Sequence, residues 1–363
     1  MNFVCRQFSR AMAGQNMSSK FRGCLVGSLF GDCMGAPFEG NDISSGDKLV
    51  IQRYFDRMED PNFKGPFKKY TDDTAMMKSV AQFLIDTPEP DLKHLAELFT
   101  NEFFKQPRRG YGGSVVSVFE KLRKSKFNDI FLPSKEQFNG QGSYGNGGAM
   151  RIAPIPLYFH DDFDNMLNIA AESTKITHSN ELGIHGALLQ CLAVHQAFLA
   201  DPNTPINVDE FCNKLLEKMK AIERSYYNDV ESDSDTPYCE RIKLIQKFLS
   251  TKYSDEYDDE VIRDLGNDIS AFESVPTAIF CFLRAQNTIP GIKTDNIFRR
   301  TIQYAITLGG DTDTIACMAG AIAGAYLGEE SINKAILQHC EKVEDIVKLA
   351  DSLYAARPHD GKG

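Results

Sequence analysis

The sequence contains no pair of cysteines at Cys-x-x-Cys spacing, although nine cysteines are scattered along its 363 residues. Their number is odd, and the spacing typical of zinc ribbons and of dithiol redox motifs is missing. These features argue against a disulfide framework and against a structural zinc site. We therefore expect reduced, mostly buried thiols in an intracellular protein.

The sequence also lacks an excess of positive charge and a long hydrophobic run. Lysine and arginine number 40 against 50 aspartates and glutamates, which gives a formal net charge of -10. An acidic surface disfavours direct electrostatic binding to nucleic acid. No uninterrupted apolar run is long enough to span a membrane, and no secretory signal is found. We predict no membrane partner and no sequence-specific nucleic-acid partner.

Acidic residues are absent from the first 31 positions, which carry Arg6, Arg10, Lys20 and Arg22 among serines and alanines. This composition is typical of a mitochondrial transit peptide, and equally of a disordered basic leader. Both interpretations stay open. We expect a leader over residues 1–20, one domain over 21–355 and a flexible tail over 356–363.

Alternating strand patterns are scarce, and helical spacing dominates. Apolar residues recur three and four positions apart in residues 91–104, 113–124, 182–199 and 207–221. Residues 225–237 and 254–260 are rich in Asp, Glu, Ser and Tyr, and we interpret them as solvated loops around one helix. The sequence predicts an all-α fold.

Two ridges of small residues lie near opposite ends of the chain. Gly23, Gly27, Gly31 and Gly35 recur every four residues, as do Ala316, Gly320 and Gly324. Residues four apart share a helix face, so each ridge permits close backbone approach. Because glycine destabilises helices, both segments need tight packing in compensation. We expect the two helices to meet at the centre of a single domain.

Two short clusters of carboxylates and hydroxyls are the strongest chemical signal. Thr71-Asp72-Asp73-Thr74 and Asp311-Thr312-Asp313-Thr314 each stand just before a helical pattern. Helix capping explains one or two acids in each cluster. It explains less well the same composition at two distant places. These hard oxygen ligands suit Mg²⁺, Mn²⁺ or Ca²⁺ and disfavour zinc.

A glycine-rich segment runs from Phe138 to Arg151. Gly140, Gly142 and Gly145 match the spacing of a dinucleotide-binding fingerprint. We reject that fold because no clear strand precedes the segment and prolines follow it. Such a loop can still present backbone N–H groups to a phosphate, and Phe138 and Tyr144 can stack on a base. The alternative is an exposed loop without a ligand.

Single residues outside these clusters are weaker candidates for a functional site. Glu39 follows the first ridge in a turn-prone segment, and a lone acid there is usually only exposed. His178 precedes a helix, where a histidine is more often a capping or core residue than a catalyst. Residues 109–113 form a further glycine-rich turn that would edge a ligand site, whereas Asn267 and Glu273 look structural.

The two Asp/Thr clusters resemble the paired metal motifs of the ADP-ribosyl-acceptor hydrolase family, which includes the dinitrogenase-reductase-activating glycohydrolases. Residues 137–150 and 272–278 are most similar to the branch that hydrolyses serine-linked ADP-ribose. The resemblance covers residues 21–354. It implies an all-α orthogonal bundle around a binuclear site for two Mg²⁺ ions, with Mn²⁺ as a possible substitute.

The resemblance also implies roles for individual residues. It implies metal ligation by Glu39, Thr71, Asp72, Asp73, Asp311, Asp313 and Thr314. Catalytic roles fall to Glu39, Asp73 and Asp313. Contacts with ADP-ribose fall to Phe138, Gln141, Gly142, Ser143, Tyr144, Gly145, Asn146, Gly147, His178 and Ile269. Position 141 is Gln where close relatives would carry Lys, which puts one phosphate contact in doubt.

The implied activity is hydrolysis of the O-glycosidic bond between ADP-ribose and serine, with poly(ADP-ribose) and O-acetyl-ADP-ribose as further substrates. The implied partners are serine-ADP-ribosylated proteins such as histones, met by a monomer in nucleus and cytoplasm, with a mitochondrial matrix pool. Two alternatives remain: hydrolysis of arginine-linked ADP-ribose, and a non-catalytic ADP-ribose-binding or crystallin-like protein. The complete set of mutually repelling carboxylates argues against the second.

Overall fold

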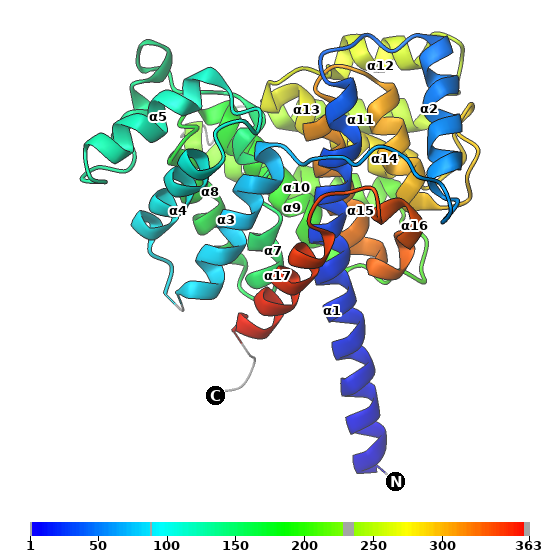
Figure 1. The fold of residues 1–363 in the computed structure, drawn as a ribbon, viewed down its shortest axis with the longest axis horizontal. Helices are drawn as coiled ribbons and strands as arrows, with labels where there is room; N and C mark the ends of the chain where they lie inside the picture. The colour runs from blue at the N-terminus through cyan, green and yellow to red at the C-terminus, as the bar shows by residue number, and fades with distance from the viewer. Residues whose placement is uncertain (1, 88, 228–235, 359–363) are drawn as a thin grey trace.

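The computed structural model describes residues 2–87, 89–227 and 236–358, and within them it contains seventeen α-helices and no β-strand (Figure 1). The helices are α1 (Asn2–Gly35), α2 (Ser45–Met58), α3 (Asp72–Asp86), α4 (Leu92–Lys105), α5 (Gly113–Lys124), α6 (Leu132–Lys135), α7 (Pro154–Tyr158), α8 (Phe163–Lys175), α9 (Glu181–Leu199), α10 (Val208–Tyr227), α11 (Pro237–Ser250), α12 (Tyr257–Leu265), α13 (Ala271–Arg284), α14 (Ile297–Thr307), α15 (Thr312–Leu327), α16 (Lys334–Leu337) and α17 (Val343–Ala356). Short 3-10 helices are η1 (Ala36–Phe38), η2 (Gln137–Gly140), η3 (Asn146–Gly148) and η4 (Glu329–Ser331). The prediction of an all-α fold is confirmed.

The two glycine-bearing helices, α1 and α15, pack against each other along the predicted ridges. A Cβ atom on Gly27 or Gly31 would lie closer than 3.0 Å to the carbonyl oxygen of Gly320 or Ala316. Every residue of α15 from Thr312 to Tyr326 is buried. The helix from one end of the chain therefore lies against the helix from the other end, as the small residues predict.

Helix α9 is the one described helix long and apolar enough to cross a membrane by length and composition. Within its apolar window 83% of the residues are buried inside the protein. It packs against α8, α13 and α15. Its apolar sequence also contains the polar residues His185, Gln190 and His195, which are buried. Helix α9 is therefore a core helix of this fold.

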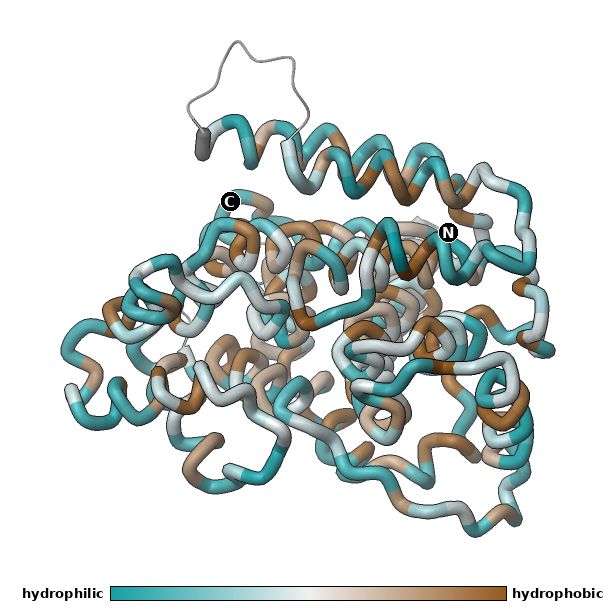
Figure 2. The backbone as a smooth tube through the Cα atoms, turned by 90° about the horizontal axis from the view of Figure 1, so that it is seen from above, coloured by the Kyte–Doolittle hydropathy of each residue, from teal (hydrophilic) through white to brown (hydrophobic). Residues whose placement is uncertain are grey.

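Outer helices bury one face and expose the other, as their apolar spacing predicts. Helix α4 buries Leu95, Phe99 and Phe103, and its N-cap Asp91 accepts a hydrogen bond from the Lys93 backbone N–H. Figure 2 shows hydrophilic and hydrophobic residues alternating along such helices. The helices predicted over 91–104, 113–124, 182–199 and 207–221 are all present, and the last continues to Tyr227.

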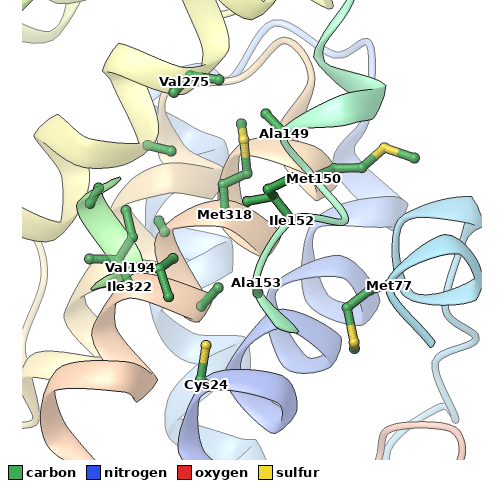
Figure 3. Close-up of a cluster of buried hydrophobic side chains, with 14 of the residues drawn as sticks. Cys24, Met77, Ala149, Met150, Ile152, Ala153, Val194, Val275, Met318 and Ile322 are labelled. Carbon is green, nitrogen blue, oxygen red and sulfur yellow. The ribbon is translucent and has the colours of Figure 1, made fainter. Parts of the chain in front are cut away.

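The central core lies where α1, α3, α9, α13 and α15 converge. Figure 3 shows side chains from these helices gathered around the segment that follows the glycine-rich loop. Ile152 and Ala153 from that segment are buried beside Met318 and Ile322 of α15. The loop is thus anchored in the core immediately after its last glycine.

The acidic segment 254–260 is an exposed loop, as its composition predicts, only over residues 254–256. Helix α12 begins at Tyr257, and its Tyr257, Val261 and Leu265 form a buried face. Asp258 is buried too, where it accepts hydrogen bonds from Lys48 at 2.6 Å and Tyr304 at 3.0 Å. The prediction was wrong for residues 257–260 because three apolar residues four apart outweigh the surrounding charges. Most of the other predicted loop, 228–235, lies outside the described residues.

The N-terminal part of α1 projects from the rest of the molecule (Figure 1). Its backbone is helical from Asn2, so the structure continues α1 through the segment for which we expected a disordered leader. Among residues 16–35, whose side chains are described, the first buried ones are Ser19 and Lys20. The boundary at residue 20 and the cleavage of a transit peptide stay predictions.

Candidate active site

The two Asp/Thr clusters occupy the N-terminal ends of α3 and α15. Thr71 is the N-cap of α3, and its hydroxyl accepts a hydrogen bond from the Asp73 backbone N–H at 3.3 Å. Asp311 is the N-cap of α15, and Asp313 lies in its first turn. Helix N-termini favour negative charge, so both clusters are stabilised locally by the helices that they begin.

The fold brings both clusters and Glu39 to one place. Carboxylate oxygens of Glu39, Asp311 and Asp313 lie within 4.8 Å of one another. Across the two clusters, the Thr314 hydroxyl donates to the Asp73 Oδ1 at 3.4 Å. The Gly40 backbone N–H donates to the carbonyl oxygen of Gly310 at 2.9 Å, which ties the loop after Glu39 to the second cluster.

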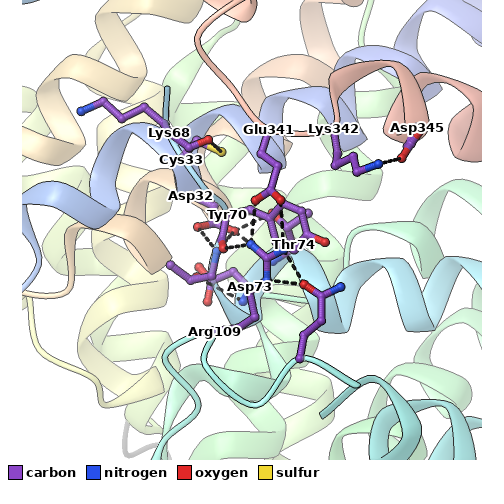
Figure 4. Close-up of polar contacts among 12 residues, drawn as sticks. Asp32, Cys33, Lys68, Tyr70, Asp73, Thr74, Arg109, Glu341, Lys342 and Asp345 are labelled. Atoms are coloured by element: carbon purple, nitrogen blue, oxygen red, sulfur yellow. Dashed lines mark hydrogen bonds and ion pairs between the residues drawn. The ribbon is translucent and has the colours of Figure 1, made fainter. Parts of the chain in front are cut away.

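Asp32, which was not predicted from the sequence, is hydrogen-bonded to the first cluster. This buried carboxylate of α1 accepts hydrogen bonds from the Thr71 backbone N–H at 2.9 Å and from the Thr74 hydroxyl at 2.5 Å (Figure 4). It also accepts from the Thr74 backbone N–H at 3.1 Å. The available signal was an acid inside an otherwise apolar, glycine-ridged helix.

Burial and mutual repulsion disfavour the charged forms of these acids. Burial, followed by the nearby charge of Asp311, raises the pKa of Asp313 to about 10. Burial and Asp32 raise the pKa of Asp72 to about 7. Burial and the charge of Asp313 raise the pKa of Asp73 well above its ordinary value. A bound cation would reverse this balance, because it favours the ionised carboxylates.

The donor set fits a hard divalent cation. Among the described residues, the buried Asp73 Oδ2 has no hydrogen-bond partner, which is costly unless a cation satisfies it. The surrounding donors are carboxylate and hydroxyl oxygens, the ligands that Mg²⁺ and Mn²⁺ prefer. The residues that would hold such ions are the seven predicted ligands, which line one cavity: Glu39, Thr71, Asp72, Asp73, Asp311, Asp313 and Thr314.

The acidic cluster opens into a cavity of about 310 Å³. All seven predicted metal-site residues line it. It also receives eight of the ten predicted ADP-ribose contacts: Phe138, Ser143, Tyr144, Gly145, Asn146, Gly147, His178 and Ile269. Gln141 and Gly142 do not line it. The structure thus brings fifteen predicted site residues, which lie between positions 39 and 314 in the sequence, into one cavity. Their individual roles stay predictions.

The glycine-rich segment forms part of the cavity wall beside the acids, and it follows short helices, not a strand. Phe138, Asn139, Gly140 and Gly142 have positive φ angles between 51° and 88°. The Asn146 backbone N–H donates to the carbonyl oxygen of Ile269 at 2.9 Å. The segment is therefore a sharply bent, pinned loop, and the rejection of the dinucleotide fingerprint agrees with its setting.

Three large apolar side chains are exposed around this wall. Phe138, Tyr144 and Ile269 are 52%, 51% and 62% exposed. Exposed aromatic faces at a cavity rim provide stacking surfaces for a nucleobase. Gln141 is exposed outside the cavity, and its carbonyl oxygen accepts from Asn180 Nδ2 at 3.0 Å.

Asn146 links the glycine-rich wall to the acids. Its Nδ2 donates to Asp311 Oδ2 at 2.5 Å and to the Ser274 hydroxyl at 3.0 Å. The backbone N–H of Asp311 donates to the carbonyl oxygen of Asn267 at 2.8 Å, in agreement with a structural role for Asn267. The position of the second cluster thus depends on both neighbouring segments.

His178 lies beneath the glycine-rich wall, against Gly147. Its Nδ1 is 2.7 Å from the Thr177 hydroxyl. Burial, together with the charge of Arg151, lowers the pKa of His178 to about 3. The imidazole is therefore neutral near pH 7 and suits hydrogen bonding better than proton transfer.

Arg151 is a second residue that the sequence analysis did not single out. Its buried guanidinium lines the cavity, lies 4.3 Å from the centre of the Phe99 ring and donates to the carbonyl oxygen of Ser173 at 2.9 Å. Burial lowers its pKa to about 9, while Asp72 acts in the opposite direction. An arginine between apolar residues directly after a glycine-rich loop was the available signal.

Comparisons with known proteins agree with this geometry. A model of the ADP-ribosylglycohydrolase family matches residues 13–363. The chain belongs to the ADP-ribosylglycohydrolase family. This glycohydrolase is 42% identical over 349 residues to ADP-ribosylhydrolase ARH3 of Gallus gallus, covering 93% of each chain. It is also 42% identical to ADP-ribosylhydrolase ARH3 of Homo sapiens, again covering 93% of both.

A solved structure described as an ADP-ribosylglycohydrolase-related protein complex has the same fold as this glycohydrolase. The TM-score is 0.64 at 19% identity, over 95% of this chain and 100% of that one. The family is metal-dependent, and its relatives here support ADP-ribosyl hydrolase activity. The family resemblance stated from the two Asp/Thr clusters is confirmed.

Proposed function

We propose that this protein is a magnesium-dependent hydrolase that removes ADP-ribose from serine side chains of modified proteins. One observation carries the proposal: the carboxylates of Glu39, Asp311 and Asp313 meet within 4.8 Å on the wall of a cavity that faces a glycine-rich loop. The similarity of residues 137–150 and 272–278 to the serine-specific branch supports the serine linkage. Poly(ADP-ribose) and O-acetyl-ADP-ribose are proposed as further substrates.

The reaction breaks the bond between the anomeric carbon of ribose and an oxygen of the acceptor. Such cleavage passes through an oxocarbenium-like state and needs an activated water and a protonated leaving group. Two Mg²⁺ ions, or Mn²⁺ in their place, would supply Lewis acidity and neutralise the carboxylates. Asp73 and Asp313 would anchor these ions, each from the first turn of a helix.

Glu39 is the residue we assign to proton transfer. It is exposed at the cavity and lies outside the α-helices, whereas Asp72, Asp73 and Asp313 are fixed in helical first turns and Asp311 is an N-cap. Burial and the charge of Asp311 raise its pKa, which brings the carboxyl closer to the range where it exchanges protons near neutral pH. The segment after it, Gly40 with a φ of 72°, would allow it to close over substrate.

The glycine-rich loop would hold the diphosphate. Residues 143–147 line the cavity wall, and glycine-rich backbone of this kind can approach a phosphate closely. Phe138 and Tyr144 would frame the adenine or the distal ribose. Neutral His178 supports the wall at Gly147.

The test is release of free ADP-ribose from a serine-ADP-ribosylated histone peptide, with Mg²⁺ and with EDTA. We expect release only with Mg²⁺. No release by folded protein with Mg²⁺ would remove the serine-specific proposal. The same assay on an arginine-ADP-ribosylated peptide would then separate the arginine-specific alternative from a non-catalytic binder.

We further propose that the protein acts as a monomer in nucleus and cytoplasm, with a mitochondrial matrix pool directed by the basic N-terminus. The absence of acidic residues from positions 1–31 supports the mitochondrial pool. Microscopy of a fluorescent fusion with and without residues 1–20 tests it: loss of the mitochondrial signal on deletion is expected, and an unchanged distribution would contradict it.

A further inference from the structure

A second cavity, of about 660 Å³, adjoins the main cavity at Glu39. The two cavities share Glu39, Thr71 and Gly110. Beyond them, the second cavity is lined by Lys69, Arg108 and other residues from the segments before α3 and after α4, and by none of the glycine-rich loop. We call it the acceptor-side groove.

The floor of this groove is built rigidly. Arg109 forms an ion pair with Glu341 at 2.7 Å and donates to the carbonyl oxygen of Tyr70 at 2.8 Å (Figure 4). Its guanidinium lies 3.7 Å from the centre of the Tyr70 ring. The Asp72 backbone N–H donates to the Arg109 carbonyl oxygen at 2.7 Å, so the groove floor and the first acidic cluster are directly joined.

The lip of the groove carries two cations, Lys69 and Arg108, and Lys69 lies close enough to Glu341 for its charge to help to lower the pKa of that carboxyl. Lys69 and Arg108 are both exposed, and neither forms an ion pair with a described residue. Glu341 is engaged by Arg109 through both carboxylate oxygens. Glu39, the remaining acid of the groove, faces Asp311 and Asp313. On a chain with a net charge of -10, this lip is a local attraction for anions.

The position of the groove determines which part of a substrate reaches it. With the diphosphate at the glycine-rich wall and the anomeric carbon at the acids, the group beyond the scissile bond must leave past Glu39. Hydrolysis adds the hydroxyl of water to the anomeric carbon and a proton to the departing oxygen. In poly(ADP-ribose) that departing group is another ADP-ribose unit, with a diphosphate of its own.

We propose that the acceptor-side groove binds the ADP-ribose unit next to the scissile bond of poly(ADP-ribose), with Lys69 and Arg108 pairing with its diphosphate. The inference rests on the proposed function and deepens it. Arginine binds phosphate oxygens bidentately, and lysine adds a compact positive charge. A serine acceptor offers no such anion unless acidic residues flank it, so the groove favours the polymer over a single modified serine.

The test compares two substrates in one protein. The variant combines Lys69→Glu with Arg108→Glu, and the matched control combines Lys64→Glu with Lys105→Glu, two exposed lysines outside both cavities. The measured quantity is kcat/KM on poly(ADP-ribose) divided by kcat/KM on a serine-mono-ADP-ribosylated peptide. We expect this ratio to fall about tenfold in the groove variant and to stay unchanged in the control.

A binding measurement separates failure of the inference from failure of the proposed function. The Kd of an ADP-ribose trimer and of ADP-ribose itself are measured on the same proteins without turnover, at low temperature. Preference of the wild type for the trimer, lost in the groove variant, supports the groove even if neither substrate is hydrolysed. An equal loss on both substrates, no loss on either, or a loss confined to peptides with acidic flanks would overturn it.

Discussion

Among single residues, Asp32 shows how a buried charge can shape a site that it does not line. Its carboxylate lies inside α1 and is satisfied by three N–H or O–H donors from Thr71 and Thr74. A buried carboxylate is tolerated only when it is well hydrogen-bonded. The carboxylate therefore fixes the backbone from which Asp72 and Asp73 project.

Asp32→Asn should weaken both stability and metal binding. An asparagine amide replaces one acceptor oxygen with an NH₂ donor, which would then face the backbone N–H of Thr71 or the donors of Thr74 instead of accepting from them. We expect a loss of about 2 kcal/mol in the free energy of unfolding and weaker Mg²⁺ binding. Urea unfolding and Mg²⁺ titration measure these effects. Asp255→Asn, at an exposed position, is the control, and equal Mg²⁺ affinity in Asp32→Asn and wild type would contradict the role.

Glu39→Ala should abolish turnover while ADP-ribose binding persists. Removal of a general acid or base typically costs about 10²–10⁴ in rate. Calorimetric titration with ADP-ribose, beside the release assay, measures both quantities. Glu39→Gln keeps the side-chain size and should show the same loss of turnover. Loss of binding with unchanged turnover at saturation would exclude the proton-transfer role.

At the scale of helices, the tightest constraint is the contact between α1 and α15. A Cβ on Gly31 would meet the backbone of Ala316 and Cys317, which cannot rotate away as a side chain can. Gly31→Ala should therefore destabilise the protein by about 3 kcal/mol. Gly113→Ala, where a Cβ meets nothing within 4 Å, is the matched control and should be neutral or slightly stabilising. Thermal unfolding compares the two, and equal effects would contradict the ridge packing.

Helices were predictable from sequence where one periodic face dominates, as in α4, α5 and α10. The prediction failed at residues 257–260, the start of α12, where acidic composition masks a narrow buried face. Both metal clusters and the glycine-rich loop were visible because several chemically similar residues stand together. Asp32 and Arg151 were not, because each is a single polar residue whose partners come from distant helices.

For the whole molecule, the raised pKa values of the acids link stability to pH. Asp72 and Asp313 have pKa values of about 7 and about 10 in the folded state, above the ordinary value of 3.8. At pH values between the ordinary pKa of an aspartate and its raised pKa in the folded state, the folded state binds more protons than the unfolded state. The free energy of unfolding therefore falls as the pH rises through this range. Mg²⁺ bound at the proposed site would replace the protons and oppose that fall.

The melting temperature in EDTA should therefore decrease from pH 5.5 to pH 8.5, a range that brackets the pKa of Asp72 at about 7. The increase that Mg²⁺ produces should be larger at the higher pH. Differential scanning fluorimetry measures both, with NaCl at equal ionic strength as the control. The same Mg²⁺-induced increase at both pH values would show that these acids do not form the cation site.

The pairing of α1 with α15 has a consequence for biosynthesis. Asp73 and Thr314, which meet in the site, are separated by 241 positions in sequence. Contacts between such distant segments form late and slow folding. While α15 is still within the ribosome, the glycine ridge of α1 has no helix to pack against. The cluster at residues 71–74 then also lacks the second cluster, at residues 311–314, that completes the site. A nascent chain stalled before residue 311 should therefore expose this helix to chaperones, and its release should depend on completion of synthesis.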